Sequence, residues 1–276
     1  MGNGFTITVL LCNFDFADTM KKTFFCCYPK QDTSPMSNQE ILAALQKYDT
    51  PSITNVVATY PSNPLCLGLY NPWQENWYTD QTIKCMYPEL GARAGYAVTC
   101  VFGLPDPAYQ RLTFGDVLRA MDDTAKPTVL VLEQRFPPHL QGKVGLAGGI
   151  MTTALKQAGC VGVVSNGPSR DIDEIRPMEM QYLLSGITPG HGELSVWSVN
   201  TPVSVAGMSV APGEIVHMDE NGACKFPADK METVLTNVQE MLKQEADLIS
   251  QIREAKTGAE IADAMASHSY VNPKQD

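Results

Sequence analysis

The chain has 276 residues, of which 44% are hydrophobic and 18% are charged, so it can bury a sizeable globular core. Its formal net charge is −10, from 20 basic and 30 acidic residues, which argues against non-specific binding to nucleic acid or acidic lipid. No apolar run reaches the ~18 residues that a membrane span requires, so we expect neither a nucleic acid nor a membrane as partner.

The eight cysteines are scattered without a Cys-x-x-Cys spacing, and histidine is rare. A zinc cluster is therefore not expected. We interpret the cysteines as reduced thiols of a cytoplasmic protein, and the alternative is a redox pair of Cys26 and Cys27.

The N-terminal part of the chain divides into an extension and the start of a domain. Residues 1–35 show no clear hydrophobic period, and we interpret them as a flexible or non-core extension. Residues 36–276 are expected to form a single domain that includes the C-terminal helices. Ser37 and Glu40 form a capping box, which predicts a helix that ends near Asp49 and a second helix directly after it.

The middle of the chain alternates strands with helices, which is typical of a mixed α/β core. Residues 60–90 are rich in Pro, Asn, Trp and Tyr without a period, and they are predicted to form a long loop region. The pattern then predicts, in order, a strand over 97–102, a helix over 113–121, a strand over 128–132, a helix that ends before Gly159 and a strand over 161–164.

After residue 180 the pattern changes to short strands separated by glycine-containing turns. The predicted strands cover residues 181–184, 195–199, 202–206, 208–210, 214–218 and 223–226. From about 228 to 256 the apolar period is helical again, and 260–265 predict one or two further helical turns.

A glycine cluster precedes the helix that leads into the strand over 161–164. Gly145, Gly148 and Gly149 bring the backbone close to another group, and Ile150 and Met151 then present N–H groups at the helix start. Such N–H groups and the positive dipole end suit a carboxylate or a phosphate. Tight packing of the helix on a strand is the alternative. The spacing is not that of a dinucleotide fingerprint and no Walker lysine follows.

Arg170 and Asp171 follow the next strand. A guanidinium can clamp an anion, and an aspartate is a ligand for a hard divalent cation. The alternative for this pair is a structural salt bridge at a turn. Asp173 and Glu174 come next, as supporting acids or as a solvated helix start. Together these residues suggest a small anionic substrate held on a divalent cation.

Two histidines have contrasting surroundings. His191 lies in an exposed-looking glycine loop, and it is a candidate for proton transfer or substrate contact. An ordinary loop residue is the alternative. His217 lies in an apolar strand, where a buried histidine with satisfied hydrogen bonds is expected.

The chain from about residue 40 to 245 resembles the RraA-like family. That family comprises regulators of ribonuclease E, 4-hydroxy-4-methyl-2-oxoglutarate aldolases and proteins once named demethylmenaquinone methyltransferases. The matching pieces are DTP (49–51), GYAVT (95–99), GGIM (148–151), GVV (162–164), GPSRD (167–171), VAPGE (210–214) and DENG (219–222).

The resemblance implies an α/β/α sandwich of the swivelling, phosphohistidine-domain-like type, with a mixed sheet of short strands and a long C-terminal helix. It implies homotrimers or hexamers with sites between subunits. In the family's aldolases, an aspartate matching Asp171 binds Mg²⁺ or Mn²⁺ largely through water, and an arginine matching Arg170 contacts the substrate's carboxylate. Backbone amides matching residues 148–151 hold the pyruvyl end.

The activity that this resemblance implies is carbon–carbon cleavage of a small 2-oxo acid. A retro-aldol step on 4-hydroxy-4-methyl-2-oxoglutarate and the decarboxylation of oxaloacetate both pass through a pyruvate enolate. A metal and N–H groups can stabilise its negative charge. We therefore expect a metal-dependent lyase similar to the class II pyruvate aldolases, with Arg170, Asp171 and His191 as catalytic residues.

The sequence departs from the aldolases at two places where they carry acids, which are Gly149 and Asn166 here. Either the metal is bound more weakly, or another group substitutes, such as His191, Glu193 or Asp173. A non-catalytic regulatory or binding protein is a further hypothesis. Another is a lyase for a different sugar acid or hydroxy acid, with His191 in an altered acid–base role.

Overall fold

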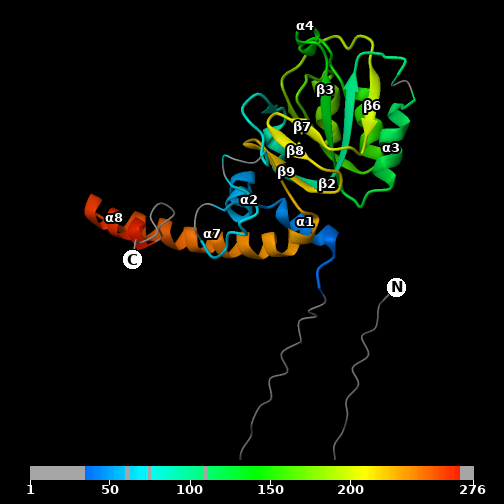
Figure 1. Cartoon of the computed structure of the whole chain (residues 1–276). Coiled ribbons are helices and arrows are strands. Elements are labelled where there is room, and N and C mark those ends of the chain that lie inside the picture. Colours follow the sequence, from blue (N-terminus) through cyan, green and yellow to red (C-terminus); the bar gives the residue numbers. More distant parts are fainter. Residues whose placement is uncertain (1–34, 60–62, 72, 74–75, 109–110, 268–276) are drawn as a thin grey trace, which may run out of the picture. The chain divides into compact units, whose positions relative to one another are not determined.

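The computed structural model describes residues 35–59, 63–71, 73, 76–108 and 111–267 (Figure 1). The described residues from Met36 onward belong to one compact unit. The expected extension over 1–35 falls almost entirely outside the described residues and stays a prediction. Within the described ranges, none of the helices combines the length and the apolar character needed to cross a bilayer.

An eight-stranded mixed sheet forms the centre of the protein. Its strands are β1 (Lys84–Cys85), β2 (Arg93–Gly103), β3 (Thr128–Arg135), β4 (Cys160–Ser165), β5 (Gln181–Leu184), β6 (Ser195–Val199), β9 (Ile215–Asp219) and β10 (Gly222–Phe226). They lie in the order β1-β5-β4-β3-β2-β9-β10, and β6 also pairs with β2. Strands β2 to β5 run parallel, and the others are antiparallel to their neighbours.

Strand β2 offers a single edge to two partners. Its first half pairs with β9, where Tyr96 lies opposite Ile215, and its second half pairs with β6, where Cys100 lies opposite Val199. The sheet curls so strongly that a Cβ on Gly162 of β4 would lie 2.8 Å from the sulfur of Met218 in β9. The sheet is therefore nearly closed.

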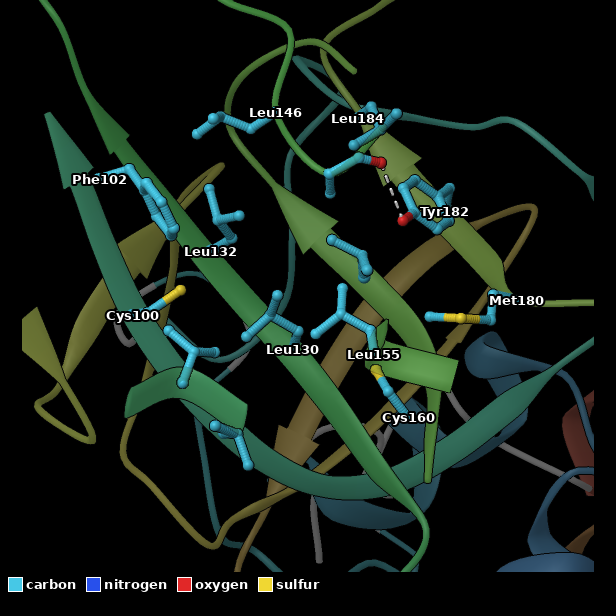
Figure 2. Close-up of a cluster of buried hydrophobic side chains, with 14 of the residues drawn as sticks. Cys100, Phe102, Leu130, Leu132, Leu146, Leu155, Cys160, Met180, Tyr182 and Leu184 are labelled. Carbon is cyan, nitrogen blue, oxygen red and sulfur yellow. Dashed lines mark hydrogen bonds between the residues drawn. The ribbon is translucent and has the colours of Figure 1, made fainter. Parts of the chain in front are cut away.

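One face of the sheet packs against helices α3 (Phe114–Asp122) and α5 (Gly149–Gln157). Phe102 of β2, Leu130 of β3 and Tyr182 of β5 belong to the same hydrophobic cluster as Leu155 of α5 (Figure 2). These strands read as continuous apolar runs in the sequence because both of their faces are buried.

The opposite face is covered by a second, two-stranded sheet of β7 (Val203–Val205) and β8 (Met208–Val210). Val205 and Met208 pack there against Val129 and Val131, and every buried member of this cluster that lies in a regular element belongs to a strand. The mixed α/β fold with a long C-terminal helix is confirmed. The layering differs from the expected α/β/α sandwich because a hairpin takes the place of one helical layer.

Helices α1 (Asn38–Leu45), α2 (Thr50–Val57) and α7 (Met231–Glu254) form a further layer, and α8 (Gly258–Ser267) follows α7 (Figure 1). The expected capping box of Ser37 and Glu40 is present, and Asp49 caps α2. The short helical elements are η1 (Pro88–Leu90), α4 (Pro138–Gln141), α6 (Ile172–Ile175), η2 (Arg176–Met178) and η3 (Ala228–Lys230).

His217 joins this helical layer to the sheet and is fully buried, as expected. Its Nε2 lies 3.1 Å from the Leu45 carbonyl oxygen, and its Nδ1 lies 3.0 Å from the Thr50 hydroxyl. Burial lowers the pKa of His217, which keeps the ring neutral. A neutral ring then donates from Nε2 and accepts at Nδ1.

Lys126 joins the ends of two helices on the first face. Its ammonium group donates to the carbonyl oxygen of Met121 in the last turn of α3 and to that of Ala158, the C-cap of α5. The last carbonyl oxygens of a helix accept no hydrogen bond from N–H groups of the same helix. A cation at this place donates to them and opposes the negative end of the helix dipole.

Candidate active site

The loops that follow β3, β4 and β5 meet beyond the carboxyl ends of these parallel strands, where α/β proteins commonly bind ligands. The Gly145 N–H donates to the Gly190 carbonyl oxygen (2.8 Å), and the Leu146 N–H donates to that of Pro168 (3.1 Å). The loops line an open cavity of about 700 Å³. Its lining consists of Gly145, Leu146, Ala147, Gly148, Ile150, Met151, Arg170, Asp171, Glu174, His191, Gly192 and Leu194.

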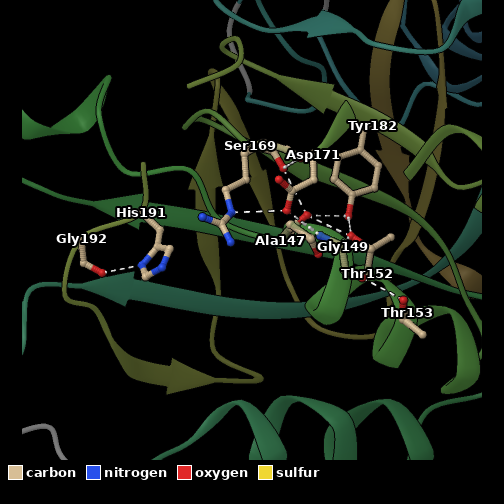
Figure 3. Close-up of polar contacts among 11 residues, drawn as sticks. Ala147, Gly149, Thr152, Thr153, Ser169, Asp171, Tyr182, His191 and Gly192 are labelled. Carbon is tan, nitrogen blue, oxygen red and sulfur yellow. Dashed lines mark hydrogen bonds and ion pairs between the residues drawn. The ribbon is translucent and has the colours of Figure 1, made fainter. Parts of the chain in front are cut away.

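The floor of the cavity is held by a group of hydroxyls around the carbonyl oxygen of Ala147 (Figure 3). Thr152, Ser169 and Tyr182 place their hydroxyl oxygens 2.9, 3.1 and 3.2 Å from it. Burial raises the pKa of Tyr182, so this hydroxyl stays protonated. Ala147 has a φ of 53°, a left-handed conformation that costs a non-glycine residue roughly 1–2 kcal/mol. The hydroxyls therefore hold a strained loop in place.

The first turn of α5 forms one wall of the cavity. Gly148 is the N-cap, and the Gly149 N–H donates to Asp171 Oδ2 at 3.0 Å. Ile150 and Met151 line the cavity directly, and their N–H groups have no acceptor within a helix at these positions. Of the four residues 148–151, Gly148, Ile150 and Met151 line the cavity, whereas the Gly149 amide donates to Asp171.

Arg170 and Asp171 stand beside this helix start. Arg170 Nε lies 3.3 Å from Asp171 Oδ2, and the two side chains are 35% and 32% exposed. The terminal nitrogens of Arg170 make no hydrogen bond within the described part of the chain, and they are free to bind an anion. Asp171 has a φ of 61°, and strained residues of this kind cluster at functional sites.

His191 lines the same cavity from the loop after β5. Its ring is exposed, and Nδ1 lies 2.7 Å from the carbonyl oxygen of Gly192. The cavity thus brings His191 together with Gly148, Arg170 and Asp171.

Gly149 belongs to the first turn of α5 but is buried, and it does not line the cavity. Among the proposed substitutes for the missing acid, Asp173 lines an adjoining hollow and Glu193 lines neither space. Asn166 has a structural role, because its side chain donates to and accepts from the backbone of Gln134 at the end of β3.

Glu174 lines the cavity. The sequence alone did not decide whether this residue is a supporting acid of the site or part of a solvated helix start. A Cβ placed on Gly149 would lie 2.6 Å from Glu174 Oε2 and closer still to Oε1. Its carboxylate therefore occupies the space in front of the residue where the resemblance leads us to expect an acid. The spacing of three residues from Asp171, at a helix start, is the signal that would have placed both carboxylates on one side.

A divalent cation is compatible with these donors. The described residues contain no cluster of three or more His, Cys, Asp or Glu side chains suited to a metal. Asp171 and Glu174 nevertheless face one cavity, and Mg²⁺ is often bound through one or two carboxylates while it keeps several waters. A Cβ on Gly148 would lie 2.5 Å from Asp171 Oδ2, so the two glycines leave room for both carboxylates.

Sequence relatives of the chain include a protein named as a putative aldolase. Protein DlpA of Legionella pneumophila is 23% identical over 164 residues, which cover 58% of this chain and 25% of that protein. A putative 4-hydroxy-4-methyl-2-oxoglutarate aldolase of Halalkalibacterium halodurans is 26% identical over 156 residues, 56% of this chain and 69% of the relative. This chain thus spans a quarter of the length of DlpA.

The fold is shared with solved structures. Streptomyces coelicolor RraAS2, described as an unusual member of the RNase ES inhibitor RraA protein family, superposes with a TM-score of 0.57 at 19% identity. The match covers 75% of this chain and 94% of that one. The family model for RraA-like proteins, described as Aldolase/RraA, matches residues 69–224. Because this match covers more than half of the chain, the protein belongs to the RraA-like family.

Proposed function

We propose that the protein is a divalent-metal-dependent carbon–carbon lyase for a small 2-oxo acid such as 4-hydroxy-4-methyl-2-oxoglutarate or oxaloacetate. The observation that supports this is a single cavity in which the Arg170 guanidinium, the Asp171 carboxylate and the start of α5 converge. The name of the Halalkalibacterium relative supports the same substrate class.

Each group has a defined part in this proposal. Arg170 binds the substrate carboxylate through its terminal nitrogens. The N–H groups of Ile150 and Met151 donate to the oxygen on which enolate charge develops, and their fixed positions need no rearrangement. Asp171 would hold Mg²⁺ or Mn²⁺, which supplies Lewis-acid polarisation of the 2-oxo group when bound. His191, which lines the cavity wall, would move a proton to or from the substrate.

The test is the release of pyruvate from oxaloacetate or from a 4-hydroxy-2-oxo acid in the presence of Mg²⁺. Asp171→Ala is expected to abolish the metal-stimulated rate. Asp173→Ala is the matched control, because this nearby acid lies outside the cavity. Unchanged turnover in the Asp171 variant would refute the assignment.

The main alternative is a regulatory or binding protein that keeps the scaffold without the chemistry. The absence of a side chain at Gly149 favours it. Calorimetry with Mg²⁺ and oxalate, which mimics the enolate, separates the two: no binding at millimolar concentration favours the regulator. The third hypothesis is a lyase of another sugar acid or hydroxy acid. A screen of such acids as substrates would support it if His191→Ala is the variant that changes the product and the other variants do not.

We further propose a homotrimer or hexamer with the cavity between subunits, in the cytoplasm. Ile150 on the cavity wall is 89% exposed, and Ile187 beside the adjoining hollow is 65% exposed. A neighbouring subunit would cover these apolar side chains. The molar mass from light scattering, compared between the native chain and Ile150→Glu, tests this proposal.

A further inference from the structure

Gly149 has no backbone reason to be glycine. It is the first residue of α5, and its φ lies outside the left-handed region that favours glycine. The reason lies in a neighbour: a Cβ at this position would lie 2.6 Å from Glu174 Oε2. A side chain at 149 and the Glu174 carboxylate in its present position would therefore occupy one space, and the exposed, flexible glutamate would have to move.

The Glu174 carboxylate also has no binding partner among the protein groups that the structure describes. It makes no hydrogen bond or ion pair with the residues that the structure describes, whereas Asp171 is held by the Gly149 N–H and by Arg170. Glu174 lines the same cavity as Asp171 and Arg170. Its two oxygens are therefore available to a ligand in that cavity.

We propose that Glu174 is the second carboxylate of the site, that it binds the divalent cation together with Asp171, and that Gly149 is required to admit it. This inference rests on the proposed lyase function. With the cation bound, two carboxylates and one guanidinium leave the site with a single net positive charge. A substrate carboxylate neutralises that charge, whereas Asp171 alone would leave a larger excess.

Binding of Mn²⁺ to the full-length protein, measured by calorimetry and by electron paramagnetic resonance of the free ion, tests this role without turnover. Glu174→Gln removes the charge and keeps the shape. Gly149→Ala keeps the glutamate but displaces its carboxylate. Each is expected to weaken Mn²⁺ binding by about tenfold or more. Asp173→Asn, an exposed acid outside the cavity, is the matched control and should change binding less than about twofold.

A swap variant keeps the test sharp. Glu174→Ala combined with Gly149→Asp moves the carboxylate from α6 to α5, and it should restore much of the affinity that Glu174→Ala alone loses. Thermal melting of each variant checks that it folds. Wild-type affinity in Glu174→Gln would overturn the inference, while loss of binding in Asp171→Ala would leave the proposed function standing. If the native protein binds no Mn²⁺ at millimolar concentration, both fail.

Discussion

Replacing Lys126 by methionine should destabilise the protein by releasing two helix ends together. The ammonium group donates to the Met121 carbonyl oxygen at the end of α3 and to the Ala158 carbonyl oxygen at the end of α5. The lysine stem packs on Gly159, where a Cβ would lie 2.9 Å from Lys126 Cδ. Methionine retains most of this apolar stem, so the variant isolates the loss of the charged donor.

The expected magnitude follows from the two bonds. A hydrogen bond from a charged donor contributes about 1.5–3 kcal/mol. Because Lys126 is half-buried, the lower value applies to each bond, which gives a loss of about 3 kcal/mol in the free energy of unfolding. For a domain of this size the melting temperature should fall by roughly 6–12 °C.

Urea denaturation followed by circular dichroism measures this loss. Lys156→Met is the matched control, because Lys156 is an exposed lysine in the last turn of α5, the helix whose C-cap carbonyl accepts from Lys126. It changes the same charge near the same dipole end and should cost at most about 1 kcal/mol. Equal losses in the two variants would show that the bridging geometry of Lys126 contributes nothing beyond its charge.

Two further predictions concern the buried polar groups. Because burial lowers the pKa of His217, the unfolded chain takes up a proton below about pH 6.5 while the folded protein does not, so the free energy of unfolding should fall as the pH drops from 6.5 towards the lowered value. His217→Asn should flatten this slope between pH 7.5 and 5.5, and an unchanged slope would contradict the assignment. Tyr182→Phe should lower the free energy of unfolding by about 1 kcal/mol and speed hydrogen exchange in the loop around Ala147. Exchange as slow as in the native protein would show that the Tyr182 hydroxyl does not hold that loop.

Much of the secondary structure could be predicted because its signals are local. The capping box at Ser37 places the start of α1, and the apolar period over 228–256 predicts the long helix α7. Strands β5 and β6 occupy the predicted residues 181–184 and 195–199. Each of these signals lies within the element that it predicts.

The layering and the role of Glu174 could not be predicted, because they depend on contacts between distant segments. Nothing local to Val205 or Met208 indicates that their hairpin covers the face of β3. The sequence shows an acid missing at Gly149, but only the packing of α6 on α5 shows a carboxylate from Glu174 in that space. Gly149 and Glu174 lie 25 residues apart along the chain.

The two partners of β2 bear on the order of assembly during folding. Strands β2 to β5 follow one another along the chain, whereas the pairing of Tyr96 with Ile215 joins segments about 120 residues apart. Pairings between remote segments carry a large loop-closure cost and form slowly. Until β9 arrives, the open edge of β2 can pair with strands of other molecules. A chain shortened before residue 215 should therefore be prone to aggregation, even though the cavity residues lie upstream of the cut.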